Sequence, residues 1–77
     1  MDITVYTKKG CFWCEELLDF MVENNVVFVE KEVRGNSNFF EEMKNLSGQT
    51  LAPTVVVDGV VYPDTDKEEI KKILKNK

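Results

Sequence analysis

The sequence contains no histidine, and it has only two cysteines, two prolines and one tryptophan. Without histidine, the chain has no imidazole to act as a general base, to pair with a cysteine or to bind a metal ion. No apolar run approaches the roughly 20 residues of a membrane-spanning helix, so we expect no membrane contact. Positive charge is also scarce, because ten basic residues against fourteen acidic ones leave a net charge of −4. This balance argues against nucleic-acid binding, which needs a basic patch.

The length of 77 residues allows one small domain, spanning residues 1–77. The chain opens directly on a strand pattern, without the charged and apolar segments of a secretion signal. Two cysteines are too few for the disulfide framework of a small secreted protein. We therefore expect a cytoplasmic protein. In that compartment thiols rest in the reduced state, and a close cysteine pair is catalytic or metal-binding rather than structural.

Changes in hydrophobic period predict the secondary structure. Runs of β-branched and aromatic residues predict four strands, at 3–6, 26–33, 54–57 and 60–62. The acidic residues of the second strand suit a position at the edge of the sheet. The pair Asp58-Gly59 predicts a hairpin turn between the last two strands.

Apolar residues at helical spacing predict three helices, one at about 11–24, one that ends at Gly48 and one that follows the turn at 63–66. Phe39, Met43 and Leu46 form the apolar stripe of the second helix. The resulting order βαβ-α-ββ-α predicts an α/β fold, a four-stranded mixed sheet with three helices. The first two strands should be parallel, because a helix connects them.

Two cysteines lie at the junction between the first strand and the first helix. Cys11 and Cys14 form a Cys-x-x-Cys pair, which beside a βαβ unit predicts redox chemistry. Unpaired N–H groups and the positive end of the helix stabilise a thiolate at Cys11, and Lys8 adds positive charge. Cys14 falls on the apolar stripe with Leu17, so it should be the more buried thiol. We predict that Cys11 attacks a substrate disulfide and that Cys14 resolves the mixed disulfide.

Other roles for the cysteine pair stay open. A structural disulfide across two residues would remove little chain entropy. A zinc site would need further ligands from carboxylates or from a second subunit. An iron–sulfur cluster held between two subunits through Cys11 is the competing class, a dimeric binding module instead of an enzyme.

Four residues, two between the cysteines and two before the third strand, are candidates for substrate binding. Trp13 is hard to bury in so small a domain, and an exposed aromatic beside a reactive thiol suits protein docking. Phe12 either packs beside the helix start or shares this exposure. Pro53 either opens a strand, where its missing N–H costs nothing, or follows a cis bond that presents the Ala52 backbone to Cys11.

The sequence resembles the glutaredoxin family of the thioredoxin fold, and the resemblance covers essentially all 77 residues. It rests on the segments Val5–Cys14 and Ala52–Gly59, together with Thr65-Asp66 at the start of the last helix. The resemblance implies that Pro53 is cis, that Cys11 is the nucleophile, and that the reaction is dithiol–disulfide exchange. We expect the protein to act as a monomer.

The resemblance also implies partners and binding residues. Disulfide-containing proteins would be substrates, and glutathione would be a co-substrate instead of a bound cofactor. No metal ion would be required. Lys8 and Asp66 match residues with which the family contacts glutathione, and Thr65 precedes Asp66 in the matched segment.

The chain departs from the family pattern at positions that bear on the electron donor. Phe12-Trp13 replaces the usual Pro-Tyr, and Leu51-Ala52 stands where the family has Thr-Val. Thr50 replaces a basic residue, and Pro63-Asp64 replaces a Gly-Gly pair that lets glutathione approach the backbone. The charge of Asp64 disfavours an anionic ligand. The electron donor is therefore either glutathione or thioredoxin reductase. Similar small redoxins take electrons from thioredoxin reductase and pass them to ribonucleotide reductase.

Overall fold

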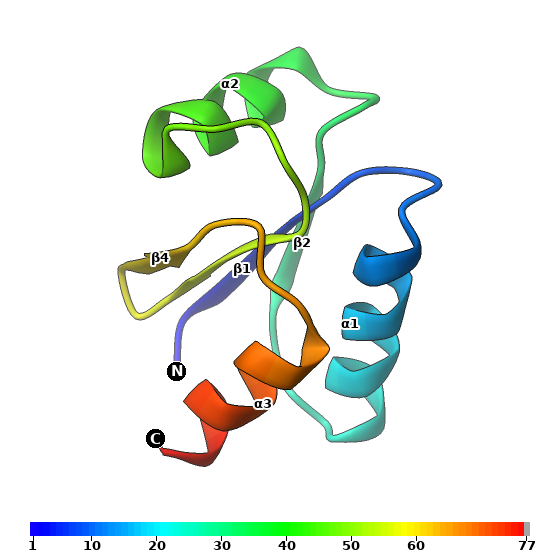
Figure 1. The fold of residues 1–77 in the computed structure, drawn as a ribbon, viewed down its shortest axis with the longest axis vertical. Helices are drawn as coiled ribbons and strands as arrows, with labels where there is room; N and C mark the ends of the chain where they lie inside the picture. The colour runs from blue at the N-terminus through cyan, green and yellow to red at the C-terminus, as the bar shows by residue number, and fades with distance from the viewer. Residues whose placement is uncertain (77) are drawn as a thin grey trace.

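Four strands form one mixed sheet in the order β2-β1-β3-β4 (Figure 1). The structure is a computed structural model that describes residues 1–76. The central strand β1 (Ile3–Thr7) pairs parallel with β2 (Val29–Glu32) and antiparallel with β3 (Thr54–Val57). The hairpin at Asp58-Gly59 then adds β4 (Val60–Tyr62) antiparallel to β3. The mixed sheet and the edge position of β2 confirm the sequence prediction.

Three helices cover the two faces of this sheet. α1 (Phe12–Glu23) and α3 (Lys67–Lys75) pack on one face, and α2 (Ser37–Ser47) packs on the other (Figure 1). The element order is the predicted one. None of the helices within residues 1–76 is long and apolar enough to cross a membrane.

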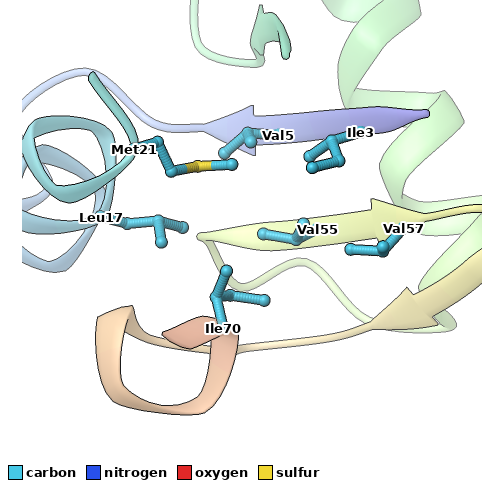
Figure 2. Close-up of a cluster of buried hydrophobic side chains, with 7 residues drawn as sticks. All are labelled: Ile3, Val5, Leu17, Met21, Val55, Val57 and Ile70. Atoms are coloured by element: carbon cyan, nitrogen blue, oxygen red, sulfur yellow. The ribbon is translucent and has the colours of Figure 1, made fainter. Parts of the chain in front are cut away.

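The main core lies between the sheet and the pair α1 and α3. Alternate residues of β1 and β3 point to this face, because successive side chains of a strand point to opposite sides. Figure 2 shows these strand residues meeting side chains from both helices. The cluster consists of Ile3, Val5, Leu17, Met21, Val55, Val57 and Ile70. Leu17 and Met21 are fully buried and four residues apart, so they lie on one face of α1. Burial of each such side chain contributes about 1.5–3 kcal/mol.

The second face of the sheet carries a smaller core under α2. Tyr6, Val33 and Met43 are buried there, with Phe39 and Phe40 packed against them. Polar contacts close the cluster at its edge, because the Tyr6 hydroxyl donates to the Glu42 carboxylate and Lys31 forms an ion pair with the same group. The Lys31 ammonium also lies 5.7 Å from the Tyr6 ring centre and 5.4 Å from the Phe39 ring centre.

The predicted start of the second strand is wrong. β2 begins at Val29 and not at residue 26, because the turn that closes α1 takes up residues 24–26. Asn25 adopts a left-handed conformation (φ 56°), and the Val26 N–H donates to the Met21 carbonyl over 2.9 Å, which closes the helix in a Schellman motif. α2 contains Phe39, Met43 and Leu46 as predicted, with Met43 buried and Leu46 48% exposed at the end of the stripe.

The contacts of Glu42 with Tyr6 and Lys31 should contribute measurably to the free energy of unfolding. Hydrogen bonds from Lys31 and Tyr6 lower the pKa of the Glu42 carboxyl from 4.5. The stability that the ionised Glu42 carboxylate gives to the fold is therefore fully present above pH 4.5. It is lost as the pH falls through the lower pKa of the folded state. We expect Glu42→Gln to cost about 1 kcal/mol near neutral pH, and the cost to shrink in acid. Urea unfolding of both proteins at two pH values measures this. An equal loss from Glu41→Gln, at an exposed neighbour on α2, would contradict the assignment to these contacts.

Candidate active site

The chain turns sharply between β1 and α1 to place Cys11 at the start of the helix. Gly10 takes the left-handed conformation (φ 86°), which favours glycine, and the Cys11 N–H donates to the Lys8 carbonyl over 3.0 Å. Cys11 is the N-cap of α1, and its sulfur accepts the Cys14 N–H at 3.3 Å. A helix N-terminus that directs an N–H at a sulfur stabilises the thiolate form.

A second segment faces the Cys11 sulfur from across the site. The Ala52–Pro53 peptide bond is cis, as the family resemblance implies. The Cys11 thiol donates a long hydrogen bond of 3.9 Å to the Ala52 carbonyl. The Pro53 carbonyl in turn accepts the Thr65 N–H at 2.9 Å, which joins this segment to the start of α3. The backbone of Ala52 therefore forms one wall beside Cys11.

The two cysteines differ in their surroundings. Cys11 is half-buried, whereas Cys14 is only 2% exposed and lies on the buried face of α1, so it is the more buried thiol, as predicted. Burial, followed by a hydrogen bond with Cys11, raises the pKa of Cys14 to about 12, while the Lys8 N–H and its charge act in the opposite direction. Cys14 consequently keeps its proton at neutral pH. The accessible thiol is thus Cys11 and the protected thiol is Cys14, and their roles as attacking and resolving thiols stay predictions.

Exposed apolar side chains follow Cys11 in the chain and precede the Ala52 wall that faces it. Phe12 is 61% and Trp13 is 58% exposed, so both aromatic residues point to solvent, and their rings meet edge to face at 5.4 Å. Leu51, next to Ala52, is 53% exposed. We name Phe12, Trp13 and Leu51 the apolar rim. Leu51 was expected only as a departure from the family pattern, although its place two residues before Pro53 was the available signal.

The remaining predicted binding residues make contacts within the protein. The Lys8 ammonium donates to the Thr50 carbonyl at 3.5 Å and so lies toward the segment that ends at Pro53. Thr65 is buried and its hydroxyl donates to the Glu69 carboxylate. Asp66 is the N-cap of α3, where Oδ1 accepts the Glu69 N–H at 2.9 Å. The fold brings Lys8 and the Pro53 segment together, and contact of Lys8, Thr65 or Asp66 with a substrate stays a prediction.

Comparisons with known proteins agree with this arrangement. A family model described as Glutaredoxin matches residues 3–62. An uncharacterized glutaredoxin-like 8.6 kDa protein in the rubredoxin operon of Clostridium pasteurianum is 31% identical over 72 residues, covering 94% of this chain and 96% of its own. Glutaredoxin 3 of Escherichia coli strain K12 is 32% identical over 57 residues, covering 74% of this chain and 69% of its own. The crystal structure of the thioredoxin-like protein BC3987 has a TM-score of 0.84 at 28% identity, covering 92% of this chain and 97% of its own.

The fold and the position of the cysteine pair define a small protein of the thioredoxin-like class, as the sequence predicted. The match over residues 3–62 is more specific. The chain belongs to the glutaredoxin family.

The unequal burial of the thiols predicts selective alkylation. At neutral pH, iodoacetamide should modify Cys11 and spare Cys14, because Cys14 is 2% exposed and its pKa is raised to about 12. Mass spectrometry of peptides from the reduced, folded protein identifies the modified residue. Both cysteines should be labelled after unfolding in urea, which is the control. Equal labelling of the two thiols in the folded protein would contradict the structure.

Proposed function

We propose that this protein is a thiol–disulfide oxidoreductase that reduces disulfides of other proteins through its two cysteines. The observation that carries the proposal is the Cys11 sulfur at the N-terminus of α1, with the buried Cys14 one turn further along. We further propose that it works as a cytoplasmic monomer without a bound cofactor or metal ion, since the two thiols supply both electrons.

The reaction proceeds in two exchange steps. The Cys11 thiolate attacks one sulfur of the substrate disulfide, that bond breaks, and the released substrate thiolate takes up a proton. Cys11 is then joined to the substrate by a mixed disulfide. Cys14 loses its proton, attacks the Cys11 sulfur and expels the second substrate thiolate, which is protonated in turn. The substrate gains two electrons and two protons, and the protein is left with a Cys11–Cys14 disulfide.

The apolar rim supports a protein as the substrate. Phe12, Trp13 and Leu51 each expose about half of their surface or more in the two segments that meet at the reactive sulfur. Exposed aromatic side chains are strong contributors to protein interfaces. The Ala52 backbone lies within hydrogen-bond range of the sulfur, so it can align an extended substrate segment at the point of attack.

The apolar rim also favours a protein, instead of a small molecule, as the electron donor. We propose a flavoprotein reductase of the thioredoxin reductase class, which would reduce the Cys11–Cys14 disulfide with electrons from NADPH. Asp64 is exposed where the family resemblance aligns a glutathione-binding Gly-Gly pair, and its charge opposes an anionic tripeptide. Glutathione, for which Lys8 and Asp66 are the candidate contacts, is the alternative donor.

The division of labour between the thiols predicts different outcomes for two serine variants. Cys11→Ser should reduce protein disulfide turnover to background, because no attacking thiol remains. Cys14→Ser should still attack but should accumulate a mixed disulfide through Cys11, visible as a mass adduct. Turnover by Cys11→Ser would refute the proposal. An adduct on Cys14 in the Cys11→Ser variant would reverse the two roles.

The choice of donor predicts the effect of the apolar rim. The oxidised protein should be reduced quickly by NADPH with thioredoxin reductase and slowly by glutathione. Trp13→Ala should lower kcat/KM with the reductase about tenfold, because an anchor of the protein interface is lost. Val27→Ala is the matched control, since Val27 is 84% exposed and follows the opposite end of α1. Fast reduction by glutathione alone, unaffected by Trp13→Ala, would overturn the proposed donor and leave the thiol chemistry standing.

A further inference from the structure

Two side chains at the end of β2 hold the loop that leads to Cys11. The Lys9 N–H donates to the Glu32 carboxylate over 2.7 Å. The Lys9 carbonyl accepts a hydrogen bond of 2.9 Å from the Arg34 guanidinium. Both backbone polar groups of Lys9, two residues before the proposed nucleophile, are therefore fixed by side chains from another segment. We name this pair of contacts the Glu32–Arg34 clamp.

The Glu32 carboxylate is itself firmly placed. Besides Lys9, its oxygens accept the N–H groups of Gly35 at 2.7 Å and of Arg34 at 3.0 Å. Gly35 permits this approach, because a Cβ at that position would lie 3.2 Å from a Glu32 oxygen. Hydrogen bonds from Gly35, Arg34 and Lys9 hold the pKa of Glu32 below its usual value, so the carboxylate is charged at neutral pH. Three N–H groups converge on one side chain at the very end of a sheet strand.

Arg34 reaches the loop from the same side. Its guanidinium lies beside Gly10, where a Cβ, if one were present, would stand 3.7 Å from Nη1. Gly10 carries the left-handed turn that brings the chain into α1. The guanidinium therefore binds the loop at Lys9, directly before the left-handed turn at Gly10. The sheet register makes the approach possible, since Glu32 stands opposite Thr7, the last residue of β1.

We propose that Glu32 and Arg34 are positioning residues for Cys11, because they fix the Lys9 peptide and thereby hold the Cys11 sulfur over the N-terminus of α1. The inference rests on the proposed function, in which Cys11 is the attacking thiol. Loop 8–10 carries the chain from the sheet to the helix. A loop that was free to turn would move the sulfur off the 3.3 Å contact with the Cys14 N–H. That contact stabilises the thiolate, so its loss would make Cys11 less reactive.

A purely structural role and a purely electrostatic role predict different results. If the clamp only adds stability, its removal leaves Cys11 reactivity in the folded protein unchanged. If only the charge of Glu32 matters, its removal eases ionisation of the thiol, and every neutral variant does so equally. If Glu32 positions the loop, its removal should instead make ionisation of the Cys11 thiol harder. The size of this effect should also depend on which residue replaces Glu32. Glu32→Gln keeps one acceptor oxygen and should be mild, whereas Glu32→Ala keeps none and should be stronger.

The experiment measures the rate of Cys11 alkylation by iodoacetamide against pH, with the site of labelling read by mass spectrometry. In Glu32→Ala we expect the midpoint of the rate profile to rise by about half a pH unit. At pH values below the midpoint, Cys11 should then be alkylated about threefold more slowly. The rise should be smaller in Glu32→Gln. Arg34→Lys should also raise the midpoint, because it keeps the positive charge but loses the planar group that reaches Lys9.

Glu42→Gln is the matched control for the neutral Glu32 variants. It also removes one carboxylate that accepts hydrogen bonds, but it lies under α2 with Tyr6 and Lys31. Its alkylation profile should equal that of the original protein. An equal rise in this control would overturn the proposal, since the effect would then come from general destabilisation. An unchanged or lowered midpoint in Glu32→Ala would also overturn it.

Failure of the proposed function is distinguishable from failure of this inference. If Cys11 of the unmodified protein does not react in preference to Cys14, the proposed nucleophile is wrong and the clamp loses its role with it. If Cys11 reacts as expected while Glu32→Ala and Arg34→Lys retain its profile, only the clamp is refuted. Should Glu32→Ala fail to fold, Arg34→Lys decides, because Arg34 is exposed and its substitution leaves the Glu32 contacts in place.

Discussion

The hydrogen bond from the Cys14 N–H to the Cys11 sulfur serves the helix and the thiol together. A helix start leaves N–H groups without partners, and an oxygen-bearing side chain ordinarily accepts one of them. Here a sulfur takes that place, so the end of α1 is completed by the atom that does the chemistry. A thiolate accepts this bond better than a thiol does, because charge strengthens a hydrogen bond. Folding of the first turn and activation of the nucleophile therefore favour one another.

The central strand β1 connects this contact to the rest of the molecule. Its residues alternate between the two cores, with Val5 under α1 and α3 and Tyr6 under α2. Both neighbouring strands pair with it, and its last residue, Thr7, passes directly into the loop before Cys11. The site thus extends from the most constrained element of the fold. Leu17 and Met21 fix the direction of α1 against the same strand, so the orientation of the sulfur depends on apolar packing several residues away.

Local pattern was sufficient for most of the architecture. Strand composition, helical spacing and the Asp58-Gly59 turn predicted all seven elements and the mixed sheet, because each signal lies within a few neighbouring residues. The start of β2 was missed because Asn25 closes α1 with backbone bonds that an apolar run does not reveal. Cys11 and Cys14 were predicted from their spacing, and the greater burial of Cys14 followed from its helical stripe. Glu32 and Arg34 carry no such signal, since their contacts with Lys9 depend on strand pairing across 23 and 25 positions of sequence.

The placement of Trp13 has a practical consequence. It is the only tryptophan of the chain, it stands between the two cysteines, and it is 58% exposed at the surface where we expect partners to dock. Indole emission responds both to a nearby disulfide and to removal of water from the ring. The protein therefore carries an intrinsic optical reporter at its reactive end. Its redox state and its association with a partner can be followed in solution without any attached dye.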